Sequence, residues 1–411
     1  MTRGAALLAL ALLLSGCASV GPSGSPTRAT QATPGASAPF LATDLGPGGP
    51  EPVVRLTPEG ALAVAAQDPE GGGPRVWISH DQGATFALSR VNAQGAGEVD
   101  LAAASGALFV TQLGTSGNVV SVSKDGGQSW QTSPLGPQSQ YFDREWLGVD
   151  DAGHVYIVSR PRGDNTASQV SRSDDNGLTF LPQGDPWDAA HEPGLTNGNL
   201  VPWSGGLSMP YVCRDGAGVC VATSKDKGVT WTRSLARESA AGVAHVYASL
   251  AATSSGLLVA WSEPVDGRLA VFASSSADGA SWSAPVRVSG KGESALEPWP
   301  AARGGTAWIA YLSTDVPLDA GDASGAANAR WTPMAARVDA HGAPQGAPRA
   351  LTSGPVHPGP VSPPVGRGGG AAPNRLFGDF FTAIVDSRGK LVVALEKDDG
   401  TASRDLVLRE P

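Results

Sequence analysis

The 411-residue chain has few charged side chains, few cysteines and little basic character, and each shortage excludes a class of protein. Charged residues make up 16% of the chain and the formal net charge is −9, with no basic patch, which argues against a nucleic-acid partner. No stretch keeps a 3.6-residue apolar period, so the sequence predicts a body essentially free of helices. The apolar run at residues 5–14 is too short to span a bilayer.

Glycine and proline, by contrast, are abundant. The chain holds 54 glycines and 33 prolines, scattered between short apolar segments in the manner of loop-rich β proteins. With 41% hydrophobic residues and 11 tryptophans it can bury a sizeable core. Residues 18–40 are rich in Ser, Pro, Thr, Gly and Ala and predict a flexible tether. The predicted organisation is a leader at 1–17, a tether at 18–40 and one β domain at 41–411.

The leader carries Arg3, the apolar run and the sequence Leu14-Ser15-Gly16-Cys17. These four residues resemble the bacterial lipobox, in which cleavage leaves the cysteine as an acylated N-terminus. The resemblance implies lipidation of Cys17, export, and a lipid-anchored location in the bacterial cell envelope, at the outer membrane or cell surface. An ordinary signal peptide with an incidental cysteine is the alternative.

The other two cysteines, Cys213 and Cys220, flank a short segment with an Asp-Gly turn. Paired strands can bring two cysteines to bonding distance, and an exported location permits oxidation. The spacing predicts a structural disulfide. Two buried thiols are the alternative. A metal site is not indicated, because no other ligand residues cluster near the two cysteines.

One pattern, Ser-x-Asp-x-Gly-x-Thr/Ser-Trp/Phe, recurs five times, the last copy being one residue shorter. Its aspartates are Asp81, Asp125, Asp175, Asp226 and Asp278. In a tight turn an Asp accepts backbone N–H groups and Gly supplies a positive φ. A period of about fifty residues suits one four-stranded propeller blade.

The pattern resembles the Asp box, or bacterial neuraminidase repeat, of sialidase-like β-propellers, and the resemblance covers roughly residues 45–408. It implies an all-β chain forming a single β-propeller of four-stranded blades, with the boxes on the face opposite the ligand site and their aspartates structural. Residues 376–408 supply only three strands, and residues 40–44 could add the fourth. Seven blades closed by the two chain ends are favoured, and the six of classical sialidases are possible.

Residues just before each innermost strand should surround the mouth of the central channel, where nearly every blade offers a carboxylate. Such a ring could hold a cation, pair with a partner's Arg or Lys, or bind sugar hydroxyls beside tryptophans; it could also simply cap strand starts. Glu98 and Asp100 stand at this place in the second blade. The candidate binding residues are Glu51, Asp143, Arg144, Glu145, Trp146, Glu192, His245, Glu297, Trp299 and Asp379.

The longest inserted loops fall on the same face. One of them carries Asp315, Asp319 and Asp322, a weak pattern for calcium. No cofactor is required by the sequence, and calcium is possible.

Sialidases clamp their substrate's carboxylate with three arginines and use a Tyr activated by a Glu. The first arginine belongs to a Phe/Tyr-Arg-Ile-Pro motif, where this chain has Pro50 followed by Glu51. An acidic residue there would repel a carboxylate, so catalytic residues cannot be assigned. The preferred function is binding of a glycan or a protein partner by a monomer through its acidic top face. The alternatives are a divergent exo-sialidase-type glycoside hydrolase and an assembly factor without a small-molecule site.

Overall fold

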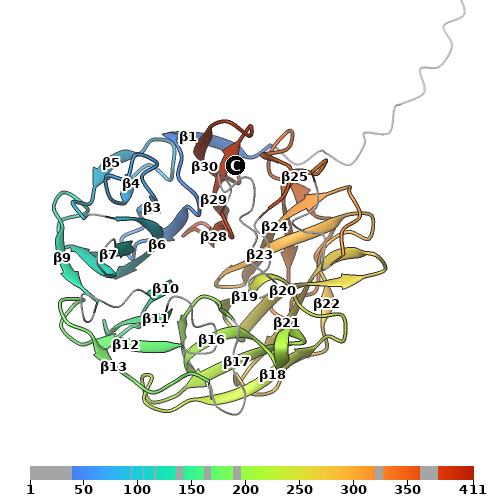
Figure 1. The fold of residues 1–411 in the computed structure, drawn as a ribbon, viewed down its shortest axis with the longest axis horizontal. Helices are drawn as coiled ribbons and strands as arrows, with labels where there is room; N and C mark the ends of the chain where they lie inside the picture. The colour runs from blue at the N-terminus through green and yellow to red at the C-terminus, as the bar shows by residue number, and fades with distance from the viewer. Residues whose placement is uncertain are drawn as a thin grey trace, which may run out of the picture. The chain divides into compact units, whose positions relative to one another are not determined.

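The computed structural model describes residues 39–93, 95–104, 106–114, 117–135, 142–161, 168–187, 196–319, 327–361 and 378–411. Pro39–Pro411 forms one compact unit in which seven antiparallel sheets are arranged in a ring around a central axis (Figure 1). The all-β propeller with seven four-stranded blades is confirmed. Within the described residues the one helical segment is a 3₁₀ turn, Arg214–Gly216. None of these residues forms a helix long and apolar enough to cross a membrane.

The first three blades follow one another in chain order, each running from its innermost to its outermost strand. Blade 1 contains β2 (Val53–Leu56), β3 (Leu62–Ala66), β4 (Arg75–Ser79) and β5 (Ala87–Arg90). Blade 2 contains β6 (Gly95–Ala104), β7 (Ala107–Gly114), β8 (Val119–Ser123) and β9 (Gln131–Pro134). Blade 3 contains β10 (Phe142–Val149), β11 (Val155–Pro161), β12 (Gln169–Ser173) and β13 (Leu181–Pro182).

Blades 4 and 6 each carry one additional short strand. Blade 4 contains β14 (Thr196–Asn197) and β15 (Val201–Trp203), which both pair with β16 (Gly206–Cys213), then β17 (Gly218–Ser224) and β18 (Thr232–Glu238). Blade 5 contains β19 (Ala244–Thr253), β20 (Gly256–Val265), β21 (Arg268–Ser276) and β22 (Val286–Arg287). Blade 6 contains β23 (Ser294–Arg303), β24 (Thr306–Thr314), β25 (Arg330–Val338) and β26 (Arg349–Ala350), with β27 (His357–Pro358) pairing to β25.

Blade 7 joins the two ends of the chain. It contains β28 (Thr382–Val385), β29 (Leu391–Asp398), β30 (Ser403–Arg409) and, as its outermost strand, β1 (Leu41–Pro47). β1 pairs antiparallel with β30, from Leu41 opposite Arg409 to Pro47 opposite Arg404 (Figure 1). The fourth strand expected near residues 40–44 is therefore present, and its pairing closes the ring and covers a sheet edge that would otherwise be exposed.

The five repeated turns connect the third and fourth strands of blades 1 to 5. In the first, Asp81 accepts hydrogen bonds from the Ser79 hydroxyl at 2.8 Å and from the Thr85 N–H and hydroxyl at 2.9 and 2.6 Å. These bonds lower the pKa of Asp81 to about 2. Each innermost strand begins at the mouth and ends on the opposite face of the ring. Because neighbouring strands of a blade alternate in direction, the turn between the third and fourth strands also lies on that opposite face. This face is called the turn face below.

The predicted disulfide is confirmed. Cys213 at the end of β16 and Cys220 on β17 are bonded at 2.07 Å, although they are not direct cross-strand partners. Cys213 stands opposite Gly218, and Cys220 stands opposite Tyr211. The bond therefore runs diagonally across the hairpin, next to its 3₁₀ turn.

Polar side chains of the innermost strands attach neighbouring blades to each other. The Asp100 carboxylate accepts the Leu147 N–H at 2.7 Å, and the Thr382 hydroxyl accepts the Val54 N–H at 2.7 Å. The Asn199 side chain bonds both the N–H and the carbonyl of Leu250, each at 2.8 Å. Because buried backbone groups need partners, these contacts fix the innermost strands around the channel.

Candidate functional site

The channel mouth is built on irregular backbone where the innermost strands begin. Glu51, Arg144 and Glu297 adopt left-handed conformations, with φ of 63°, 59° and 53°. The register of β10 shifts between Asp143 and Trp146, and that of β23 shifts between Leu296 and Trp299. Bulges of this kind redirect a side chain out of the ladder. Left-handed non-glycine residues persist only where their surroundings hold them, so the mouth is a constrained structure.

One buried arginine gathers carboxyl groups from several blades. Arg144, 4% exposed, is ion-paired with Asp379, lies 3.7 Å from Glu98 and donates its backbone N–H to Glu98 at 3.1 Å. Glu51 accepts the Asp379 N–H at 2.9 Å. The Glu297 carboxyl interacts electrostatically with Asp379 and Glu51. These five residues, called the mouth cluster below, come from blades 1, 2, 3, 6 and 7.

Burial and mutual repulsion change the protonation of the cluster. Burial, reinforced by the charge of Asp379 and opposed by Arg144, raises the pKa of Glu51 to about 7. Burial also holds the pKa values of Glu98 and Glu297 well above their usual range. One arginine cannot neutralise four carboxylates, so the cluster contains protonated and ionised groups side by side at neutral pH. Such a set can donate and accept hydrogen bonds, or transfer a proton.

The two acidic residues that flank Arg144 have other partners. Asp143 accepts a 2.7 Å bond from Arg160, and despite burial the charges of Arg144 and Arg160 lower its pKa to about 2. Glu145 is 2% exposed, accepts the Asn118 side-chain amide at 2.5 Å, and has a pKa raised by burial. Glu145 is therefore an anchor between blades 2 and 3. Asp143 holds Arg160 beside the mouth.

Three aromatic side chains that follow mouth-cluster residues along the chain pack against one another. Trp146 packs against Phe380 with ring centroids 4.8 Å apart and against Trp299 at 5.6 Å, and Trp299 and Phe380 stack at 6.0 Å. All three side chains are buried, so at the mouth they present no ring to a sugar. The aromatic layer, defined by these three residues, therefore supports the mouth from inside.

The other candidate residues are not brought to this cluster by the described structure. Glu192 and Asp322 lie outside the described residues, and His245 is on β19 with its side chain outside the description. Asp315 and Asp319 are exposed. Over the described ranges, no three His, Cys, Asp or Glu side chains come together as a metal site.

A sialidase mechanism needs arginines to clamp a carboxylate and an activated tyrosine, and several described residues of these types are engaged in other contacts. Arg144 and Arg160 both pair with carboxylates. Tyr311 donates its hydroxyl to Glu293 at 3.0 Å, and burial together with Glu293 raises the pKa of Tyr311, the opposite of what an activated nucleophile needs. Tyr156 donates to Asp150 at 2.9 Å.

Two contacts of the site could not be predicted from the sequence. Arg160 stands directly opposite Asp143 across β10 and β11, and Asn118 lies near the start of β8. Both contacts depend on strand register or blade packing, which no local motif reports.

No protein-family model matches this chain, and no curated protein matches it. Solved structures do resemble it. An ulvan lyase of polysaccharide lyase family PL25, solved bound to -[GlcA(1-4)Rha3S]-, has a TM-score of 0.54 at 13% identity over 88% of this chain and 93% of that one. A Dyadobacter fermentans protein of unknown function has a TM-score of 0.47 at 14% identity over 90% and 99%. A Trypanosoma rangeli sialidase, in complex with the inhibitor DANA, has a TM-score of 0.45 at 11% identity over 89% of this chain and 55% of that one.

Proposed function

We propose that this chain is an exported, lipid-anchored propeller that binds a glycan at its channel mouth. The observation that carries the proposal is the mouth cluster, in which one buried arginine pairs with Asp379 and faces Glu98, while Glu51 and Glu297 interact with Asp379. Asp379 and Glu98 keep 16% and 10% of their side chains exposed, so a ligand reaches these two members first. Carboxyl groups in both protonation states suit sugar hydroxyls, which donate and accept.

The charge of the cluster defines the class of glycan. The guanidinium of the cluster, Arg144, is already paired with Asp379 and faces Glu98, so an added carboxylate or sulfate would meet carboxyl groups without a cation left to pair with it. The ulvan lyase of the same fold was solved with a uronate-containing chain, and a mouth of this composition favours instead a neutral or amino-bearing oligosaccharide. A polypeptide with a Lys or Arg side chain would be the corresponding protein ligand.

A glycan array with neutral, amino-bearing, uronate-containing and sialylated oligosaccharides tests the proposal. We expect retention of neutral or amino-bearing glycans, and binding weaker by at least about tenfold for Asp379→Asn, because a charge-assisted hydrogen bond contributes about 1.5–3 kcal/mol. Glu98→Gln should weaken binding less, because it removes a neutral hydrogen bond, which contributes about 0.5–1.5 kcal/mol. Glu70→Gln, at an exposed carboxylate of blade 1, is the matched control. Selective retention of the acidic glycans, or binding unchanged by both mouth variants, would rule the site out.

Glycan cleavage is a second candidate function, favoured by the protonation pattern of the mouth. A glycoside hydrolase pairs a protonated carboxyl with an ionised one. Glu51, with a pKa raised to about 7, can fill the first role beside Asp379. Release of reducing ends from a bound neutral glycan, lost in Glu51→Gln with binding retained, would establish catalysis. Cleavage of a fluorogenic sialoside would point to the sialidase type instead.

The lipid anchor rests on the residues before Cys17 and needs its own test. Expressed in a bacterium fed radiolabelled palmitate, the chain should take up label and fractionate with membranes. Cys17→Ser should abolish labelling, while Cys213→Ser should not, because that cysteine is engaged in the disulfide. Labelling of the Cys17→Ser variant would exclude this anchor.

A further inference from the structure

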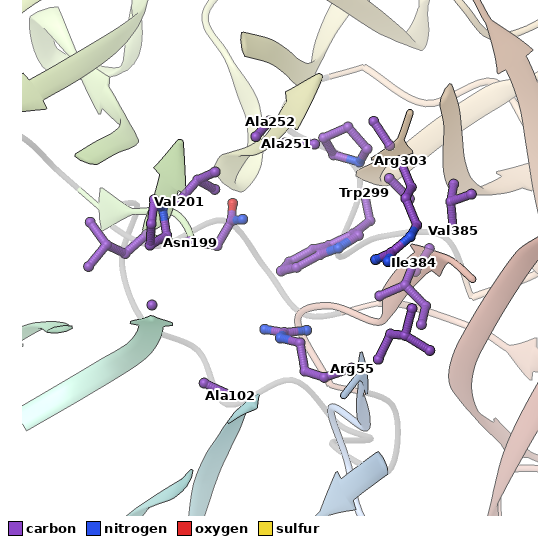
Figure 2. A pocket seen from close by; sticks show the side chains of 18 of the residues that line it. Arg55, Ala102, Asn199, Val201, Ala251, Ala252, Trp299, Arg303, Ile384 and Val385 are labelled. Atoms are coloured by element: carbon purple, nitrogen blue, oxygen red, sulfur yellow. The ribbon is translucent and has the colours of Figure 1, made fainter. Parts of the chain in front are cut away.

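The channel contains a cavity of about 330 Å³ beyond the aromatic layer, at its turn-face end (Figure 2). All seven blades line it, chiefly through the final residues of their innermost strands, such as Arg55 of β2, Arg303 of β23 and Val385 of β28. Many of the lining residues are alanines, whose short side chains leave the space unfilled. Its volume lies at the lower end of the range of small-molecule sites, about 300–1,000 Å³.

The lining of this cavity is basic and apolar. It includes two arginines, Arg55 and Arg303, and no Asp, Glu, Lys or His. The remaining polar side chain, Asn199, already bonds the backbone of Leu250 through both its oxygen and its nitrogen. The two guanidinium groups are thus the charged donors that a ligand in the cavity would meet.

The two arginines differ in how strongly they are held. Arg55 is fixed at 2.8 Å from the buried carboxylate of Asp100 and also donates to the Val54 carbonyl at 3.0 Å. That ion pair leaves Arg55 positioned but electrically balanced. Arg303 is the last residue of β23, is exposed, and forms no ion pair with the described residues. The cavity therefore has one preset donor and one uncompensated positive charge.

Figure 2 shows Arg55 and the indole of Trp299 extending into the space between the strands. Apolar side chains such as Ile384 form much of the rest of the wall. A guanidinium binds a carboxylate with two parallel hydrogen bonds, and an apolar wall binds a ring or short hydrocarbon. A ligand that satisfies both features is a small organic anion.

We propose that the turn-face end of the channel is a second binding site, which takes a small organic carboxylate with an apolar body between Arg303 and Arg55, against Trp299. The site is independent of the glycan proposal, because it lies beyond the aromatic layer and has the opposite charge to the mouth. Its ligand is a free small molecule, with a size near that of one aromatic or sugar ring.

Benzoate is the probe, titrated into the purified protein by calorimetry. Benzamide has the same ring without the charge, and inorganic phosphate has charge without the ring. We expect benzoate to bind at least tenfold more tightly than either, a difference of about 1.4 kcal/mol. The proposal would be overturned if benzamide or phosphate bound as tightly as benzoate. It would also be overturned if benzoate did not bind at concentrations up to about 10 mM, which corresponds to a binding free energy weaker than about 3 kcal/mol.

Variants then locate the binding. Arg303→Gln should weaken benzoate at least tenfold and Arg303→Lys less, whereas Arg233→Gln, the same change at an exposed arginine of β18, should have no effect. A crystal soaked in 4-bromobenzoate should show the bromine anomalous signal inside the cavity. Unchanged binding in Arg303→Gln, or a bromine found only elsewhere, would refute the site.

Discussion

Glu51 illustrates how one residue can carry both strain and charge. Its backbone is left-handed and its carboxyl is buried between blades 1 and 7, where Gly378 approaches so closely that a Cβ there would lie 2.1 Å from the Glu51 side chain. Gly378 therefore leaves no free space on that side of the Glu51 side chain. The raised pKa is therefore a consequence of packing.

Replacing Glu51 with glutamine should flatten the pH dependence of stability. The folded pKa of about 7 exceeds the reference value of 4.5, so Glu51 stabilises the fold fully below pH 4.5 and loses this contribution as the pH rises through 7. We expect the drop in the free energy of unfolding from pH 5 to pH 8 to be smaller in Glu51→Gln by at least about 1.4 kcal/mol, one pKa unit. Urea unfolding at both pH values measures it.

Glu70→Gln is the control, since that exposed carboxylate should leave the pH profile of wild type unchanged. Identical profiles for wild type and Glu51→Gln would contradict the assignment of the raised pKa to Glu51.

At the residue scale, sequence predicted which side chains stand at the mouth but not their partners. Glu51 and Asp379 are 328 positions apart, and Arg144 and Asp379 are 235 apart. Chain direction in a propeller is enough to place each of them near the axis. Arg144, which forms the ion pair with Asp379, has a left-handed backbone conformation. Left-handed conformations are rare outside glycine, so an arginine in the sequence gives no sign of one.

At the scale of elements, blade 7 contains a second pair of buried acids. Glu396 on β29 and Asp405 on β30 are direct cross-strand partners, 1% and 0% exposed. Burial raises the pKa of Glu396 to about 9 and that of Asp405 to about 8. Two like groups opposite each other avoid repulsion only while protonated, so the blade that closes the ring is weakened by alkali.

The double variant Glu396→Gln, Asp405→Asn should therefore be more stable than wild type at pH 9. In wild type, stability is greatest below the unfolded pKa values near 4 and falls as the pH rises through 8 and 9. We expect the difference in the free energy of unfolding, double variant minus wild type, to be larger at pH 9 than at pH 6 by at least about 1.4 kcal/mol. Urea unfolding at both pH values measures it.

The matched control is Asp399→Asn in the turn between the same two strands. Hydrogen bonds from Thr401 and Ala402 lower the pKa of Asp399 to about 2. Its replacement should therefore change the free energy of unfolding by the same amount at pH 6 and at pH 9. A double variant that follows the wild-type curve at alkaline pH would show that the two acids are ionised in the fold.

The blade boundaries were predictable because each repeated turn marks the start of a fourth strand. The division of the innermost strand of blade 4 into β14 and β15 was not. Gly198 lies in the break, and a Cβ there would lie 2.0 Å from the Ala248 carbonyl oxygen of blade 5. The interruption thus follows from close approach of the next blade, which a single strand's sequence does not reveal.

At the scale of the whole molecule, closure depends on a strand from the opposite end of the chain. β1 covers the edge of β30, and Asp44 binds Arg404 at 2.7 Å. The sequence predicted this pairing because the last segment was one strand short. It could not predict the channel cavity, since seven strand ends that are far apart in sequence enclose it.

Removing residues 1–48 should leave the edge of β30 open and cause association, because exposed strand edges pair with other chains. Size-exclusion chromatography should show dimers or larger species and a lower melting temperature. Removing residues 1–38 is the control, because it keeps β1 intact. A monomer of unchanged stability after the longer deletion would mean that β1 is dispensable for closure.

One residue of the aromatic layer also belongs to the second site. Trp299 packs against Trp146 and Phe380 of that layer and also lines the turn-face cavity, so one indole is shared by the two ends of the channel. An organic anion at the turn-face end would contact a ring whose packing neighbours support the mouth, so the two ends of the channel are joined through one side chain. Linkage then requires reciprocity: whatever factor the anion applies to the glycan's affinity, the glycan must apply to the anion's.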